Sequence, residues 1–337
     1  MRLLKRVAIG ILILGLIGFA AWTLLYKNSN QGAVVPLQAF SIADTGSITK
    51  IIISNKLGDT STLIRQTNGG WMVNNTYQVD KVKIYNLLAT LKLIQIKNTL
   101  SDSAKQNTIK TMMMGSFSFE AYNGDKLLNK YYVGMPTQDQ LGTNMYLPDY
   151  DAIIVTHEPG FNGYLSPRYI AEAEQWRSKS VYELKAEQIV KVKINYKNTP
   201  NADFELIKTQ KGGYTLTQLA RNQTISITDD QAMFYLSGYK KIFFEGFTHF
   251  NKLERDSVLK QTEFARIQVQ TTTKQLPDLV LFEMKPDNRT KQVRESSGMD
   301  ADHFFATQIP KGTDLFQMQT LVLQQILAGY DAIAKGK

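Results

Sequence analysis

Apolar and polar residues alternate in short runs after residue 47, and the same series of patterns occurs twice. Runs rich in β-branched residues, such as residues 48–53 and 189–194, predict strands. A Gly-Gly pair follows in each half between two further strand-like runs, which is typical of a tight hairpin because glycine tolerates positive φ. Helical stretches then begin at Asp80 and at Asp229. In the first of them apolar residues recur at helical spacing, which indicates a face turned toward a core.

The strand-like runs of the two halves match one another in order. The matching pairs are residues 48–53 with 189–194, 63–65 with 206–208, 69–71 with 212–214, 117–122 with 265–270, 131–133 with 281–283 and 145–147 with 304–306. The offset between partners grows but never reverses, as insertions into surface loops would produce. Each half is expected to close with a helix, near residues 161–175 and 317–334. We therefore predict an α+β fold of two tandem homologous units, residues 48–178 and 179–337, each a mainly antiparallel sheet with packed helices.

A long apolar run precedes the repeated part. Residues 1–6 form a short basic head, and the 19 residues from Val7 to Leu25 carry no charge. As a helix this run would span about 29 Å, close to the roughly 30 Å thickness of the hydrocarbon core of a bilayer. We therefore predict a single-pass transmembrane helix over residues 7–26, acting as an uncleaved signal anchor, and a linker over residues 27–47.

The charges around the apolar run predict its orientation. Arg2, Lys5 and Arg6 precede it and only Lys27 closely follows it, so the positive-inside rule places the N-terminus in the cytoplasm. The bulk of the chain would then lie beyond the inner (cytoplasmic) membrane, in a periplasmic or other extracytoplasmic space. A cleaved signal peptide is the alternative, because small residues near position 20 offer a loose cleavage site. Both interpretations export the repeated part.

The composition excludes several kinds of catalytic and binding site. The 337 residues include no Cys, which excludes a disulfide scaffold, a thiol nucleophile and a Cys-ligated metal site. The formal net charge of +9 is partly a topology signal, because three of the positive charges precede the apolar run. The other basic residues are mainly Lys and are spread along the chain, whereas a nucleic-acid groove needs clustered Arg and Lys with stacking aromatics. We therefore expect no nucleic-acid partner.

A search for catalytic motifs finds little. The chain has no G-x-S-x-G, Walker A, G-x-G-x-x-G or H-E-x-x-H motif. The spacing S-x-x-K begins at Ser47, Ser237 and Ser257, but without the companion motifs of penicillin-binding enzymes. Residues 300–303 (Asp-Ala-Asp-His) could supply metal ligands, although they read more simply as a polar loop entering a strand. We predict no catalytic residue, no metal site and no cofactor.

Two segments are candidates for binding rather than catalysis. Gly and Pro mark a long connection over residues 134–143, and such loops on a rigid scaffold are common binding sites. Three consecutive methionines at residues 112–114 form a soft apolar patch. Core filling is the simpler interpretation of these methionines, and a partner surface is the alternative.

The join between the two units is the third candidate. Residues 175–185 contain Trp and Tyr and are too apolar for a loose tether, so we expect a stiff connection whose aromatic side chains pack between the units. Pockets are common at domain interfaces. A helix with solvated charges is the simpler interpretation. The residues that would converge on such an inter-repeat seam are Arg168, Tyr169, Glu172, Trp176 and Arg177.

Residues 48–95, with their strand, Gly-Gly-Trp hairpin and Asp-started helix, resemble the domain of unknown function 4340 family, as do Tyr132-Val-Gly134 and Met145-Tyr-Leu147. The join from Trp176 to Val181 resembles that family's boundary between tandem units. The resemblance covers most of residues 44–310. It implies an N-terminal membrane segment, repeated α+β units outside the membrane, and an accessory role beside ABC transporter components of the gliding-motility type. It brings no catalytic residues.

These observations predict a non-enzymatic, membrane-anchored interaction module on the extracytoplasmic side of a bacterial envelope. Its partner would be another protein of the envelope, such as an ABC-type transport or motility complex. The alternative is an envelope enzyme or ligand-binding protein whose site lies at the inter-repeat seam.

Overall fold

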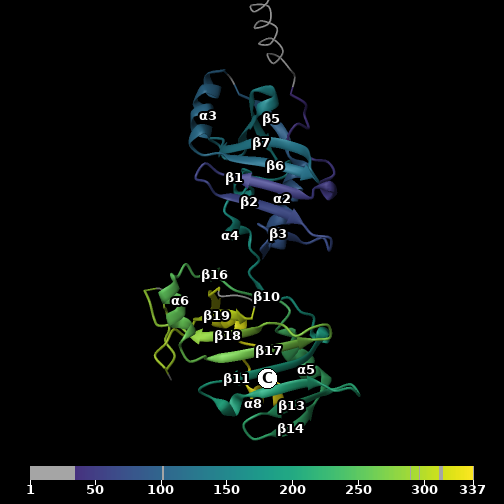
Figure 1. The fold of residues 1–337 in the computed structure, drawn as a ribbon, viewed down its shortest axis with the longest axis vertical. Helices are drawn as coiled ribbons and strands as arrows, with labels where there is room; N and C mark the ends of the chain where they lie inside the picture. Colours follow the sequence, from purple (N-terminus) through teal and green to yellow (C-terminus); the bar gives the residue numbers. More distant parts are fainter. Residues whose placement is uncertain (1–34, 101, 289, 296, 311–313, 337) are drawn as a thin grey trace, which may run out of the picture. The chain divides into compact units, whose positions relative to one another are not determined.

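The computed structural model describes residues 35–100, 102–288, 290–295, 297–310 and 314–336. The chain divides into two compact units, the first ending at Ser178 and the second beginning at Lys179. Each unit is built on one large antiparallel sheet with short helices (Figure 1). The predicted α+β class with two mainly antiparallel sheets is therefore confirmed.

The described strands of the first unit all belong to one sheet. Its strands are β1 (Lys50–Ser54), β2 (Thr60–Arg65), β3 (Trp71–Val73), β4 (Tyr77–Gln78), β5 (Gln95–Thr99), β6 (Phe117–Asn123), β7 (Lys126–Pro136), β8 (Thr143–Leu147) and β9 (Ala152–His157). Among the described residues their order in the sheet is β4-β3-β2-β1-β6-β7-β8-β9-β5. The strand β5, which follows the first helix in sequence, therefore lies at the far edge beside β9.

The helix α2 (Lys81–Leu93) closes the main core of the first unit. The Asp80 carboxylate accepts hydrogen bonds from the backbone N–H groups of Val82 and Lys83, so Asp80 is the predicted N-cap. The predicted apolar stripe is buried with Ile84, Leu87 and Leu91 on the core side. This stripe packs with the inward residues of the central strands, which alternate along each strand as a half-buried sheet requires.

The sequence does not predict the second helix of this unit, α3 (Asp102–Met114). It contacts β7 and β9 through Met112, which is buried, while Met113 and Met114 are exposed. The Met112 side chain lies over Gly134 of β7. Met112 therefore fills space under α3 as the simpler interpretation predicts, whereas Met113 and Met114 remain on the surface.

The helix α3 packs closely on β7 at Gly134, where the absence of a side chain leaves room for Met112. A Cβ atom at Gly134 would lie 2.7 Å from Met112 Cγ and 2.8 Å from the Asn144 carbonyl oxygen. We expect Gly134→Ala to destabilise the first unit by about 1–3 kcal/mol through overpacking. Chemical denaturation measures the loss, and adding Met112→Ala should restore part of it. A Gly134→Ala variant as stable as the parent chain would contradict this packing.

Residues 35–47 belong to the first unit rather than to a free tether. Phe40 and Ile42 are buried in its core, and Phe40 meets Tyr131 edge-to-face with ring centroids 5.3 Å apart. The backbone N–H of Ile42 donates to the Leu91 carbonyl at 2.7 Å. The first part of the expected linker, residues 27–34, lies outside the described residues, as does the predicted transmembrane helix over residues 7–26.

Among its described residues, the second unit contains the remaining strands and four further helices. The strands are β10 (Ser180–Tyr182), β11 (Ile189–Tyr196), β12 (Phe204–Lys208), β13 (Tyr214–Gln218), β14 (Gln223–Ile227), β15 (Ile242–Phe243), β16 (Gly246–Phe247), β17 (Ala265–Thr271), β18 (Asp278–Glu283), β19 (His303–Ile309) and β20 (Phe316–Gln319). The helices are α5 (Asp229–Ser237), α6 (Lys252–Leu259), α7 (Thr320–Leu323) and α8 (Tyr330–Ala334). Thr228 caps α5 in a capping box with Gln231.

The two large sheets have the same strand order. Among the described residues the second sheet runs β14-β13-β12-β11-β17-β18-β19-β20-β16, while β10 and β15 pair separately. Counted along the chain without β10 and β15, this order repeats that of the first sheet. Each sequence match lies on, or leads into, strands with the same place in the two sheets. The strand pairs are β1 with β11, β2 with β12, β3 with β13, β6 with β17, β7 with β18, and β8 with β19.

The two predicted closing helices are present only as short pieces. Residues 161–175 are mostly irregular, with a 3₁₀ turn at Ser166–Arg168 and a short helix α4 (Ala173–Trp176). Pro167 lies inside this stretch and cannot donate the backbone hydrogen bond that a continuous helix needs. Residues 317–334 are likewise divided between β20, α7 and α8, with Gly329 at the N-cap of α8.

Within the described part of the chain, we find no helix that is long and apolar enough to cross a membrane.

Candidate functional site

A large hollow lies in the first unit, on the face of the sheet that α3 covers. Its volume is about 1140 Å³, and we call it the polar groove. The loop between β7 and β8 forms one side, α3 the other, and β5 with β9 the floor. The lining residues are Lys97, Asn98, Leu100, Ala104, Asn107, Thr108, Thr111, Met135, Pro136, Thr137, Gln138, Asp139, Asn144 and Val155.

An ion pair fixes one rim of the groove. Lys97 Nζ on β5 lies 3.7 Å from Asp139 Oδ2 and donates to the Leu141 carbonyl at 3.0 Å. Hydrogen bonds from the Thr137 hydroxyl and the Leu141 N–H hold the pKa of Asp139 below its usual range. The β7–β8 loop is thus tied to the edge strand by this ion pair. The two charged side chains that line the groove neutralise one another.

The floor is shaped by a glycine and an amide. A Cβ atom at Gly142 would lie 2.6 Å from Val155 Cγ1 and 3.3 Å from Thr137 Cγ2, so only glycine fits between them. Asn144 Nδ2 donates to the Met135 carbonyl at 3.1 Å, which holds the β7–β8 loop open beside the sheet. The Gly- and Pro-marked segment 134–143, a candidate from sequence, therefore forms one wall of the groove.

The groove offers neutral polar groups. Among the described residues, the side chains of Asn98, Asn107 and Gln138 make no hydrogen bond. The Thr108 hydroxyl donates to the Ala104 carbonyl at 2.9 Å, which leaves its oxygen lone pairs able to accept. Side-chain amides can donate and accept at once, so this lining matches the backbone amides of an extended chain. A strongly charged ligand would find no countercharge here.

The corresponding face of the second unit is filled instead. Its helix α6 packs Val258 on Val280 and Phe282 of β18 and on Leu315, which together form a small separate apolar cluster. Phe305 of β19 joins this cluster, and its ring meets that of Phe250 edge-to-face at 5.2 Å. Apolar side chains therefore occupy, in the second unit, the space between helix and sheet that the first unit leaves open.

Two of the five predicted seam residues are part of the first unit's core. The Trp176 ring is fully buried, and its Nε1 donates to the Ile170 carbonyl at 2.8 Å. The Tyr169 hydroxyl lies 2.9 Å from the Tyr131 hydroxyl, and burial raises the pKa of Tyr169 well above its usual value. Both side chains pack within the core of the first unit and present no surface to a ligand.

The three charged seam residues also lie within the first unit. The Arg168 guanidinium donates to Glu158 Oε2 and to the Thr90 hydroxyl, and it lies 4.4 Å from the centre of the Phe161 ring. Arg177 stacks on Tyr77 at 3.6 Å. Glu172 is the residue before α4, and its side chain makes no capping hydrogen bond there.

Asp300 and His303, which the sequence presents as a polar loop and only as a possible source of metal ligands, are neighbours in the second unit. Asp300 is buried, and it accepts from the N–H groups of Asp302 and His303 at 2.7 and 3.1 Å, and from the Thr290 hydroxyl at 2.9 Å. His303 Nδ1 lies 3.2 Å from Asp300 Oδ2, and its Nε2 lies 3.8 Å from Glu245. No group of three or more His, Asp or Glu side chains placed to hold a metal occurs among the described residues. The carboxylate therefore organises the loop that leads into β19.

Asp300→Asn should destabilise the second unit by about 1–3 kcal/mol at pH 7, because an amide cannot accept this set of hydrogen bonds. Burial alone would raise the pKa of Asp300, but the hydrogen bonds to its carboxylate outweigh it and hold that pKa below its usual range. A lowered folded-state pKa adds stability above the unfolded-state pKa of about 4, and this stability is lost as the pH falls through the folded-state value. Chemical denaturation at several pH values from 7 to 3 gives the free energy of unfolding of both chains. The difference in this free energy between the parent and Asp300→Asn should shrink below about pH 4. A difference in unfolding free energy that does not change with pH would contradict this role.

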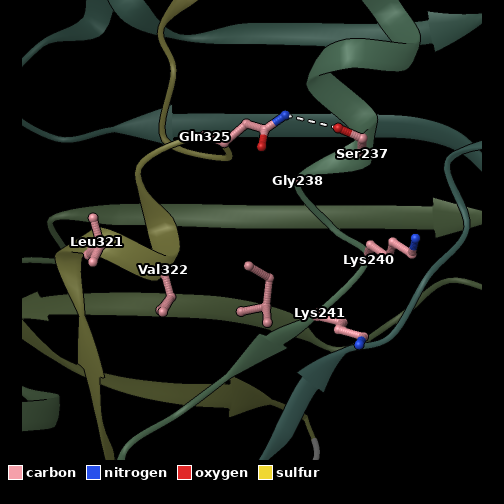
Figure 2. A pocket seen from close by; sticks show the side chains of 8 residues that line it. Ser237, Gly238, Lys240, Lys241, Leu321, Val322 and Gln325 are labelled. Atoms are coloured by element: carbon pink, nitrogen blue, oxygen red, sulfur yellow. Dashed lines mark hydrogen bonds between the residues drawn. The ribbon is translucent and has the colours of Figure 1, made fainter.

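The S-x-x-K spacing is not a catalytic pair at Ser237. The Ser237 hydroxyl donates to the Phe234 carbonyl at 2.6 Å and accepts from Gln325 Nε2 at 3.1 Å (Figure 2). Ser47 likewise donates to the Asp44 carbonyl at 2.8 Å, while Lys50 lies over the Tyr122 ring. Both hydroxyls serve local structure.

No protein-family model matches the chain, and a search of curated proteins finds no match. The resemblance to the domain of unknown function 4340 family stays a prediction from the residues that carry it.

Proposed function

We propose that this chain is a non-enzymatic interaction module of a bacterial envelope, held in the inner membrane by residues 7–26 with its N-terminus in the cytoplasm. In this proposal the two units lie on the extracytoplasmic side. The polar groove of the first unit binds an extended, uncharged segment of a protein partner. The observation that carries the proposal is the lining of the groove by neutral polar side chains, among which the amides of Asn98, Asn107 and Gln138 make no hydrogen bond within the described part of the chain.

The position of the groove supports an extended ligand. Its floor includes β5, which among the described residues pairs with β9 alone and so has one free edge. An exposed strand edge offers backbone N–H and C=O groups to an added strand. Asn98 on β5 and Asn107 on α3 both line the groove, and their side-chain amides can donate to and accept from a bound backbone. Backbone pairing gives affinity in this mode, and the groove gives selectivity.

The shared strand order supports the further proposal that the two units arose by duplication of one ancestral unit. Two chance folds would not be expected to repeat a nine-strand order with matched sequence segments on equivalent strands. In this proposal the two copies then diverged, because a groove lies beside α3 in the first unit, whereas an apolar cluster packs under α6 in the second. The partner site would then be a property of one copy.

The resemblance to the domain of unknown function 4340 family supports an accessory role in an ABC-type transport or motility complex, whose components would supply the bound segment. The alternative, an enzyme or ligand-binding site at the inter-repeat seam, gains no support from Tyr169 and Trp176, because both side chains are buried in the first unit.

Panning random peptides against the detergent-solubilised full chain tests the groove proposal. We expect enrichment of extended peptides rich in amide and hydroxyl side chains. Their affinity should change little between about 50 and 500 mM salt, because the groove is neutral and screening acts only on net charge interactions. Enrichment of acidic or basic peptides with strongly salt-dependent binding would overturn the proposal, as would no enrichment.

A further inference from the structure

The second unit has a smaller pocket of different character, which we call the lysine-edged pocket. It lies between the C-terminal end of α5 and the segment that follows β20, and its volume is about 400 Å³. Figure 2 shows Leu321 and Val322 on one side and Lys240 and Lys241 on the other. The hydrogen bond from Gln325 to Ser237 joins the two walls. The pocket therefore combines an apolar wall with a cationic one.

The apolar wall extends onto the open surface. Leu321 is 75% exposed, and Val322 beside it is 36% exposed. Exposed apolar side chains that line a hollow together are candidates for a binding surface.

The cationic wall carries two positive charges without a counter-ion among the described residues. Lys240 and Lys241 are exposed, and within the described part of the chain neither forms a side-chain hydrogen bond or an ion pair. None of the described residues that line the pocket is acidic. Two adjacent unpaired ammonium groups therefore favour an anion at this wall.

We infer that the lysine-edged pocket docks on an anionic phospholipid surface. Lys240 and Lys241 would bind lipid phosphates, while Leu321 and Val322 would enter the boundary between headgroups and acyl chains. Basic side chains beside exposed apolar ones are the pattern of interfacial membrane binding. A soluble anion would engage the lysines alone and would leave the exposed apolar wall without a function.

The absence of Cys allows a direct test in the full chain. Leu321→Cys carries an environment-sensitive fluorophore, and the chain is reconstituted into nanodiscs. We expect a blue shift of the emission in discs that contain phosphatidylglycerol, and a much smaller one in discs of phosphatidylcholine alone. The double variant Lys240→Glu/Lys241→Glu should lose the shift. Lys240→Gln/Lys241→Gln should reduce it, which separates charge loss from charge reversal.

The matched control is a label at Leu57→Cys, an exposed apolar position in the first unit, whose emission should not respond to phosphatidylglycerol. Thermal unfolding checks that each variant is folded. Equal shifts in both disc types would overturn the role of the lysines, and no shift in either would overturn membrane docking. A shift produced by inorganic phosphate alone would assign a small-anion site instead. None of these outcomes depends on the polar groove, so the two proposals can fail separately.

Discussion

Replacing Trp176 by alanine should destabilise the first unit by about 3–5 kcal/mol, the range for removing a large aromatic side chain from a packed core. The ring is fully buried, and its loss would also leave the Ile170 carbonyl without its donor. The backbone carbonyl of Trp176 accepts from the Asp80 N–H at 2.8 Å, so collapse around the cavity would disturb the start of α2. Most domains are stable by only about 5–15 kcal/mol, so this is a large fraction of the total.

Denaturant unfolding of the full chain, followed separately in each unit by introduced probes, measures this effect. The neighbouring variant Arg177→Ala is the control, because it removes a cation–π contact with Tyr77 and should cost less than about 1 kcal/mol. We expect the first unit's transition to shift strongly in Trp176→Ala and the second unit's transition to stay unchanged. Equal shifts in both transitions would show that Trp176 does not act through the first unit's core alone.

Filling the polar groove should abolish partner binding without unfolding the chain. Ala104 lies on α3 and lines the groove, so Ala104→Trp places an indole ring in the space where the bound segment would run. We expect the affinity for a groove-selected peptide to fall at least about tenfold, equivalent to about 1.4 kcal/mol. The volume of about 1140 Å³ can accept the ring, so the stability of the first unit should change little.

The matched control for the filled groove is Gln106→Trp. Gln106 is exposed on the same helix and does not line the groove. Fluorescence anisotropy of a labelled peptide compares the two variants with the parent chain. Equal loss of affinity in both variants would mean that the peptide does not bind in the groove.

The strands could be predicted from the sequence because their signals are local. β-branched runs, alternation and the Gly-Gly turns identify segments such as Ile51–Ile53 and Val192–Ile194 directly, and Asp80 reveals the start of α2. The helices α3 and α6 could not be recognised in the same way because each buries little apolar surface, through Met112 in one and Val258 in the other. A capping box at Asn251 and Glu254 was the available signal for α6.

Only one wall of the polar groove could be predicted from the sequence. Gly and Pro mark its β7–β8 wall in the sequence, so the amino-acid pattern alone identifies this loop as a candidate. The opposite wall depends on α3 and on β5 reaching the far edge of the sheet, a long-range pairing that no local pattern encodes. The burial of Trp176 could not be predicted for a related reason. Its place near a domain boundary suggests an interface, and only the tertiary structure shows that its ring packs in the first unit's core.

Photo-cross-linking in intact membranes tests the proposed role of the polar groove most directly. A photoreactive residue at Met135, which lines the groove and is 52% exposed, is compared with one at Leu127, which lies on the same strand outside the groove and is 45% exposed. Our account predicts one reproducible protein product from Met135, lost when Ala104→Trp is added, and no such product from Leu127. The same product from both positions, or none from Met135, would contradict it.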